Sequence, residues 1–253
     1  MHRLTLYSAC IGTMVFASGA LAQTEEIAPH RITVVMTPGI TSWLQLPSDD
    51  MVQTRRDLAQ GRFVSTRQLR RLADLGDGFA ALRFAQRLEE SGAVNPVDIA
   101  HYYGMAAATG RGGAIMNMIR YLDQIDPADV SPQRLSLLGS IVIAYANAGN
   151  SAAAEALVRY HWRQVPFGPL YDEVETVLAR LDGELAAELS LDHSVAILQD
   201  RQHTRDDLLD VQTYLARASQ STSLQTRLVA QNLEPVLQEA LAEYSNWQEE
   251  DPQ

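Results

Sequence analysis

Two windows of this sequence match each other without a gap, and no other feature constrains the fold as strongly. The first window is LGDGFAALRFAQRL, residues 75–88, and the second is TGRGGAIMNMIRYL, residues 109–122. Gly76 matches Gly110 and Leu88 matches Leu122, so the offset is 34 residues. This period is typical of two-helix repeat units, which stack because one hairpin cannot bury its own apolar face.

Helical periodicity dominates the sequence from Met51 onward, because apolar residues recur three and four positions apart. Ser65 followed by Gln68 predicts a capped helix start, and so does Ser131 followed by Pro132. Glycines predict the turns between helices; they are Gly61, Gly76, Gly92, Gly110 and Gly149. We therefore predict an all-α fold, an array of α/α helical hairpins with additional C-terminal helices.

Small and large residues alternate in the stretch YYGMAAATGRGGAIMNMIRYL, residues 102–122. Small side chains let two helices approach closely, whereas large ones fill the spaces between them. We expect close contacts at Ala106, Ala107, Gly112 and Ala114. We expect the filling residues to be Tyr102, Tyr103, Met116 and Met118.

The repeat unit resembles the Sel-one-like repeat, a close relative of the tetratricopeptide repeat. That family's pattern opens with glycine and a small residue and closes on a helix with an aromatic residue, paired alanines and a terminal glycine. The matching residues are Gly76, Ala80, Ala85, Gly92, Ala100, Tyr103, Ala106, Ala107, Gly110 and, in the next unit, Ala114. The loop GAVNPVD contains fewer glycines than the family pattern. The resemblance covers about a fifth of the chain, and it implies a tetratricopeptide-like superhelix with an adaptor role in protein complexes.

The chain divides into regions by composition. Residues 51–169 form the predicted repeat array, which includes a second hairpin of looser tetratricopeptide character between Arg134 and Trp162. Residues 170–247 form an acidic helical region that does not align with those repeats, and Pro235 is expected to kink or split its last helix. Residues 248–253 are expected to be a frayed acidic tail.

Residues 1–22 have the layout of a secretory signal, with Arg3 near the start, an apolar run, and Ala20-Leu21-Ala22 before Gln23. We expect cleavage after Ala22, no stable membrane anchor afterwards, and a periplasmic or secreted protein. The single cysteine, Cys10, lies in this segment, so the mature chain has no disulfide or thiolate site. Residues 23–50 read as an extended leader or an arm, and Trp43, Leu44 and Leu46 favour packing of that arm.

The charges are unevenly distributed. All 20 basic residues are arginine, and the net charge is −11. Residues 51–169 hold 13 arginines and 10 acids, whereas residues 170–253 hold 5 arginines and 17 acids. A short basic face is a poor nucleic-acid binder, because phosphate affinity grows with the number of cationic contacts. The basic face, which we propose as a candidate protein-binding surface or a solvated helix face, comprises Arg55, Arg56, Arg67, Arg70 and Arg71.

Few residues suggest chemistry. The weak metal candidate is the set Asp200, His203 and Asp207, whose spacing places them on one helical face. Ordinary helix-start chemistry explains the same residues, with Thr204 as the cap and the acids in the first turn. No catalytic residue and no cofactor are predicted.

We therefore predict an exported scaffold that binds other proteins, because helical arrays usually present a concave surface to a partner. The family resemblance implies a role in envelope signalling or assembly. The surface that we first expect to contact a partner comprises His101, Tyr102, Met105 and Arg111, and the basic face is the second candidate. The alternatives are an envelope hydrolase or metal-dependent enzyme using residues 200–207, and a protein that self-associates through its oppositely charged ends.

Overall fold

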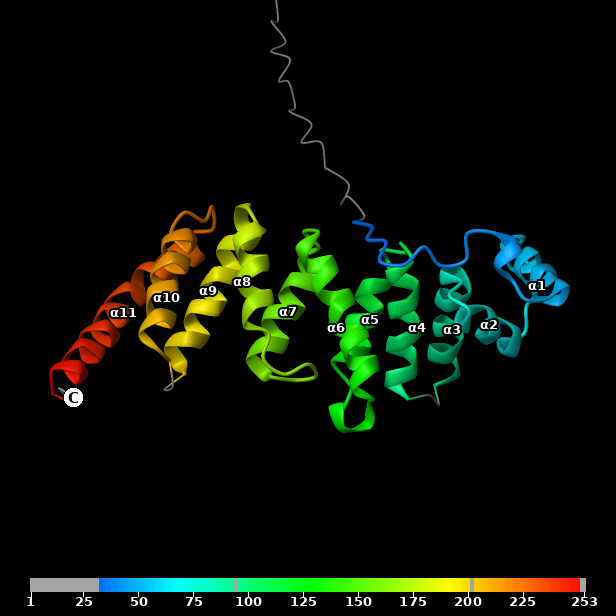
Figure 1. The fold of residues 1–253 in the computed structure, drawn as a ribbon. Helices are drawn as coiled ribbons and strands as arrows, with labels where there is room; N and C mark the ends of the chain where they lie inside the picture. Colours follow the sequence, from blue (N-terminus) through cyan, green and yellow to red (C-terminus); the bar gives the residue numbers. More distant parts are fainter. Residues whose placement is uncertain (1–31, 93–94, 201–202, 251–253) are drawn as a thin grey trace, which may run out of the picture. The chain divides into compact units, whose positions relative to one another are not determined.

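The structure is a computed structural model, and it describes residues 32–92, 95–200 and 203–250. Within these ranges the chain is all-α, with eleven α-helices and no strand (Figure 1). Two 3-10 helices, η1 (Trp43–Gln45) and η2 (Pro127–Asp129), lie before α1 and α6. The helices are α1 (Asp49–Ala59), α2 (Thr66–Asp74), α3 (Gly78–Ser91), α4 (Pro96–Ala108), α5 (Ala114–Leu122), α6 (Pro132–Asn147), α7 (Ser151–Arg163), α8 (Tyr171–Arg180), α9 (Gly183–Gln199), α10 (Arg205–Ala218) and α11 (Leu224–Glu250).

Consecutive helices pack as hairpins, and the hairpins stack on one another. The pair α3 and α4 forms one hairpin and the pair α6 and α7 forms another, as the sequence predicts. Helix α4 also contacts α6, and α5 contacts α7, so both of these helices contact the following hairpin. The expected helical-hairpin array is therefore confirmed.

Helix starts follow the predicted capping residues. Ser65 and Gln68 form a capping box at α2, and the Ser131 side chain accepts from the Arg134 N–H at α6. Thr204 caps α10 together with Asp207. Of the expected kink or split at Pro235, the split is wrong, because α11 runs through this residue without a break, and the kink stays a prediction.

The glycines matched at an offset of 34 residues adopt the same backbone conformation. Gly76 has φ +93° and Gly110 has φ +90°, the left-handed region that glycine enters without steric cost. The N–H of Gly76 donates to Ala73 O (2.8 Å), and that of Gly110 donates to Ala107 O (2.9 Å). Gly149, with φ +85°, ends α6 in the same way. Three helix ends in the array thus share one turn geometry.

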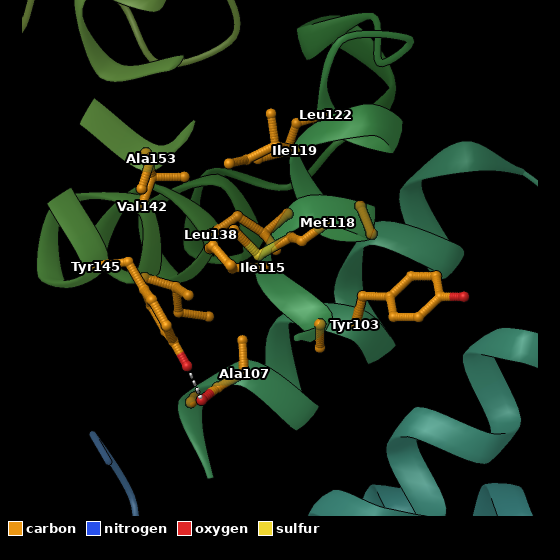
Figure 2. Close-up of a cluster of buried hydrophobic side chains, with 14 of the residues drawn as sticks. Tyr103, Ala107, Ile115, Met118, Ile119, Leu122, Leu138, Val142, Tyr145 and Ala153 are labelled. Carbon is orange, nitrogen blue, oxygen red and sulfur yellow. Dashed lines mark hydrogen bonds between the residues drawn. The ribbon is translucent and has the colours of Figure 1, made fainter. Parts of the chain in front are cut away.

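The small residues lie where the chain is most crowded. A Cβ added to Gly78 would stand 1.7 Å from Thr109 Oγ1, and one added to Gly112 would stand 2.1 Å from the Ile32 carbonyl oxygen. Ala106 and Ala107 are fully buried, and the Tyr145 hydroxyl donates to the Ala107 carbonyl oxygen at 3.0 Å (Figure 2). These contacts leave no room for larger side chains.

The predicted filling residues are buried with one exception. Met118 lies in the core beside Leu138 and Ile115, as Figure 2 shows, and Tyr102 and Tyr103 are buried as well. Met116 is 55% exposed, because it lies on the outer face of α5, which buries Ile115, Met118 and Ile119. The expectation for Met116 is therefore corrected.

An extended arm, residues 32–41, packs on the helix ends. The N–H groups of Met36 and Thr37 both donate to Ala108 O, and the N–H of Ile40 donates to Gly76 O. Val35 forms an isolated antiparallel bridge with Thr109. The arm thus contacts the two matched turns. Of the three apolar residues expected to pack, only Leu46 is buried, while Trp43 and Leu44 remain exposed.

The buried apolar side chains form two clusters. The larger cluster runs from Leu46 to Leu189, and the smaller one draws on α9, α10 and α11 between Leu191 and Leu237. Trp162 and Tyr214 pack against both clusters. The boundary between the clusters thus falls within the acidic third of the chain.

The predicted regions and the described helices differ in detail at the ends. The proposed signal, residues 1–22, and the start of the leader lie outside the described residues. Helix α1 begins at Asp49, two residues before the predicted array, and α11 reaches Glu250, so the predicted tail from residue 248 begins inside a helix. No helix in the described ranges is long and apolar enough to span a bilayer.

Candidate functional site

The predicted arginines come together with aromatic rings beside the arm. A cavity of about 420 Å³ opens between the arm, α1 and the start of α3. Arg55 and Arg56 of α1 line it, with Arg111 from the turn before α5. Trp43 and Phe79 supply aromatic surface, and Trp43 is 57% exposed. The site therefore combines cations with open apolar area.

Arg55 holds the cavity wall in place. Its Nε donates to Asp77 Oδ2 at 2.8 Å, and its Nη2 donates to the Ile40 carbonyl oxygen at 2.7 Å. Asp77 in turn accepts from the N–H groups of Phe79 and Ala80, so its carboxylate caps α3. One arginine thereby ties the arm, α1 and α3 together, and its charge is already compensated.

The other two arginines that line this cavity, Arg56 and Arg111, remain available to bind a ligand. Arg56 is exposed, and its guanidinium forms neither a hydrogen bond nor an ion pair with a described residue. The Arg111 guanidinium lies 5.1 Å from the centroid of the Phe79 ring, within range of a cation–π interaction. Arg83 lies 5.3 Å from the same ring. The ring therefore holds guanidinium groups beside the cavity without neutralising them.

A second cavity, of about 620 Å³, adjoins the first and shares Leu58, Ala59 and Phe79 with it. Phe63, 85% exposed, lies along it, and the Arg87 guanidinium is 5.5 Å from the Phe63 ring centroid. We call the two adjoining cavities the basic groove. Its arginines are Arg55, Arg56, Arg62, Arg83, Arg87 and Arg111, and its carboxylates are Asp77 and Glu90.

The arginine face predicted from the sequence is split by the fold. Arg55 and Arg56 line the basic groove, whereas Arg67, Arg70 and Arg71 are exposed on α2 and do not line it. Arg70 lies 3.7 Å from Asp74, an exposed ion pair along the helix. The predicted face is therefore too large, because the arginines of α1 line the basic groove and those of α2 lie outside it.

The predicted partner surface around His101 is also divided. Arg111 belongs to the basic groove, but Tyr102 is buried and donates to Asp74 Oδ1 at 2.7 Å. Burial, and then this hydrogen bond, raise the pKa of Tyr102 to about 12. His101 and Met105 are half-buried and line neither cavity. Tyr102 is thus corrected from a partner-facing residue to a packing residue.

The environment of the His101 ring is set by packing against other side chains rather than by solvent. Its Nδ1 is buried, with no hydrogen-bond partner among the described residues, and its ring meets Tyr102 edge-on at 5.2 Å. Burial lowers the pKa of His101, and nearby Arg134 lowers it further. The imidazole is therefore neutral at neutral pH.

The aromatic members of the basic groove were missed by the sequence reasoning. Trp43 begins η1, Phe63 lies between α1 and α2, and Phe79 lies in the first turn of α3 after the Asp77 cap. For two of the three the signal is an aromatic residue close to an arginine, with Phe63 after Arg62 and Phe79 four positions before Arg83. That pattern is too common to single out a site without the fold.

The weak metal candidate does not form a coordinating set. The Asp207 carboxylate accepts from Thr204 N at 2.6 Å and from Thr204 Oγ1 at 2.8 Å, as a helix cap. His203 Nδ1 contacts the Asp200 carbonyl oxygen. In the part of the chain that the structure describes, no three histidine, cysteine, aspartate or glutamate side chains are placed to hold a metal ion. The geometry favours the capping interpretation.

Comparisons with protein-family models, with curated proteins and with solved structures each find no match to this chain.

Proposed function

We propose that this chain is an exported helical-repeat scaffold whose basic groove binds an acidic, extended segment of a partner protein. The carrying observation is the groove itself, where six arginines and three exposed or half-exposed rings face two carboxylates. The Sel-one-like resemblance, with its envelope signalling and assembly roles, supports the same proposal.

The chemistry of the groove selects an acidic peptide. Arg56, Arg83, Arg87 and Arg111 form no ion pair within the described ranges, so they are free to bind carboxylates. Guanidinium groups bind carboxylates in a bidentate geometry. Trp43, Phe63 and Phe79 offer apolar area between these charges, and such rings are enriched at the centres of protein interfaces.

The length of the groove favours an extended segment. The two cavities share Phe79, so a chain that contacts Trp43 at one end continues towards Phe63 at the other. Side chains of an extended peptide alternate in direction, which lets acidic residues meet arginines while apolar residues meet the rings.

A peptide titration tests the proposal. The probe is a short peptide that alternates glutamate with leucine, and its matched control replaces each glutamate by glutamine. We expect the acidic peptide to bind the mature protein, with an affinity that falls as salt rises. The variant Arg56→Ala/Arg111→Ala is expected to weaken binding by about 2 kcal/mol, near 1 kcal/mol per exposed charge pair.

The control variant is Arg67→Ala/Arg71→Ala, which removes the same charge from α2 outside the groove. It should bind the peptide as the unmodified protein does. Equal losses in the two variants would show that overall charge, not the groove, drives binding. Equal affinity for the glutamate and glutamine peptides would overturn the proposal.

Export has its own test. The sequence of residues 1–22 supports cleavage after Ala22, so the mature protein isolated from the envelope fraction should begin at Gln23. A protein that retains Met1 in the cytosolic fraction would contradict export and leave the groove proposal to stand on the peptide titration.

The enzyme alternative at residues 200–207 remains a prediction. The Asp207 carboxylate acts as a helix cap, and no described contact favours catalysis there. Stoichiometric zinc or manganese in the purified protein, lost on His203→Ala, would support that alternative.

A further inference from the structure

The acidic third of the chain contains a cavity of about 320 Å³ between α7, α8, α9 and α10. Five aromatic side chains line it, and they are His161, Trp162, Tyr171, His193 and Tyr214. Carboxylates from α8 and α10 also line it, among them Glu175 and Asp210. We call this site the acidic cavity. It shares no lining residue with the basic groove.

His193 lies at the centre of the aromatic wall. Its ring centroid is 5.0 Å from that of Trp162, 5.2 Å from that of Tyr214 and 5.8 Å from that of His161. Tyr171 meets His161 edge-on at 4.5 Å. Rings packed at these distances form a rigid apolar lining with electron-rich faces.

Two buried polar atoms of the residues in this wall have no hydrogen-bond partner within the described chain, and they are Trp162 Nε1 and His193 Nδ1. His193 is 6% exposed, and its buried Nδ1 has no hydrogen-bond partner within the described chain. His161 differs, because its Nδ1 accepts from the Leu170 N–H at 3.1 Å. Buried polar atoms are nearly always hydrogen-bonded, so the orphaned His193 Nδ1 in this cavity wall points to a ligand that donates to it.

The charge of the acidic cavity is one-sided. In the described part of the chain no arginine lines it, while Glu175, Asp207 and Asp210 do. Burial raises the pKa of Asp210, and the neighbouring carboxylates Asp207 and Asp206 raise it further. The carboxylates of Glu175 and Asp210 form no hydrogen bond or ion pair with a described residue. Clustered carboxylates beside aromatic faces attract an organic cation.

We propose that the acidic cavity binds a short aliphatic amine that carries a second hydrogen-bond donor, such as an amino alcohol. The ammonium group lies with Glu175 and Asp210 at the mouth. The alkyl chain packs against Trp162 and Tyr214, and the second donor meets His193 Nδ1. The proposal is independent of the proposed function, since it uses other helices and the opposite charge.

Three small probes separate these contributions in a calorimetric titration of the mature protein. The probe 5-aminopentan-1-ol carries both the charge and the second donor. Pentane-1,5-diol lacks the charge, and pentylamine lacks the second donor. We expect the amino alcohol to bind most tightly and pentylamine about fivefold more weakly, the value of one modest hydrogen bond. The diol should show no binding.

Variants locate the binding within the cavity. Glu175→Gln and Asp210→Asn should each weaken the amino alcohol about fivefold, as loss of one partly exposed charge contact does. His193→Phe should bring the amino alcohol to the affinity of pentylamine. The matched control is Glu155→Gln, which removes one exposed carboxylate from α7 outside the cavity and should change nothing.

Several outcomes would overturn the proposal. They are equal binding of the diol and the amino alcohol, no binding of any probe, or carboxylate variants that bind as the control does. A lysine-containing peptide that binds as tightly as the amino alcohol would move the cation to a protein partner and overturn the small-molecule assignment. If a variant fails to fold, a salt series on the unmodified protein still decides, since binding that ignores salt contradicts an ammonium ligand.

Discussion

The basic groove and the acidic cavity both place charge beside aromatic rings, but they are built in opposite ways. The groove lies between an extended arm and the helix turns, and its free charges are exposed arginines such as Arg56. The cavity lies among four helices, and its central polar residue, His193, is buried. An open surface suits an extended chain, whereas a walled cavity suits a small ligand.

The difference follows from the packing underneath. The groove rests on the repeat array, where matched glycine turns at Gly76 and Gly110 hold the arm. The acidic cavity lies where the repeat signal fades and two apolar clusters meet at Trp162 and Tyr214. The basic groove therefore lies on the surface of the stacked hairpins, whereas the acidic cavity lies where the two apolar clusters meet.

The largest predicted effect concerns His193 and its response to pH. Burial, and then the neighbouring His161, lower the pKa of His193 to about 4, although Asp207 opposes them. The unfolded chain takes up a proton near pH 6.5, but the folded chain does so only near pH 4. The contribution of His193 to folding stability is therefore complete above pH 6.5, and roughly 3 kcal/mol of it is lost as pH falls towards 4.

Urea denaturation at several pH values between 7.5 and 4.5 measures this loss. His193→Phe removes the titrating group and keeps a ring, so the variant should lack this loss, and its stability relative to the unmodified protein should rise as pH falls. An unchanged pH profile in the variant would show that the cavity is open to water. The acidic cavity would then be as exposed as the basic groove, and the contrast between the two sites would be lost.

The next effect tests the array that supports the groove. Ala107 is fully buried, and its carbonyl oxygen accepts from Tyr145. Ala107→Leu overpacks this contact at a cost of about 1–3 kcal/mol. Thermal melting should show the loss. Peptide binding at the groove should weaken with it, while binding of the amino alcohol at α7–α10 should not. Equal damage to both sites would mean that they belong to one cooperative unit.

A smaller effect separates two adjacent arginines. Arg55 bonds the buried Asp77 and the Ile40 carbonyl oxygen, so Arg55→Gln should cost about 1–3 kcal/mol of stability. Arg56→Gln removes no such hydrogen bond, so it should change the free energy of unfolding by less than about 0.5 kcal/mol. Chemical denaturation measures both. The peptide titration should show a clear loss for Arg56→Gln, and a stability loss in that variant would contradict its role as a free cation.

The sequence predicts the array well because its signals are local. Ser65 with Gln68 caps α2, and Gly76 and Gly110 end helices in one conformation. Each signal acts within a few residues, so periodicity and capping are enough to find the hairpins. The same logic does not predict that α11 continues through Pro235.

The sites could be predicted only in part, because they join distant segments. Arg56 and Arg111 are 55 positions apart in the sequence, and only the arm and the turn before α5 bring them to one groove. Tyr102 and His193 owe their roles to burial, and the spacing of residues in the sequence does not show that these two side chains are buried. The Tyr102 hydroxyl meets Asp74 across two helices, a contact that the sequence pattern leaves open.

The smallest predicted effect follows from the opposite charges of the two sites. Exposed arginines at the groove and carboxylates in the last third attract one another between copies, and each such pair contributes less than about 1 kcal/mol. Static light scattering should therefore detect weak association at low ionic strength that disappears near 0.5 M salt, where screening is strong. Arg56→Ala/Arg111→Ala should reduce the association more than Arg67→Ala/Arg71→Ala does, because only the first pair lines the groove. Oligomers that persist at high salt would show apolar self-association instead, and the acidic segment in the groove would then have to compete with a second copy of this chain.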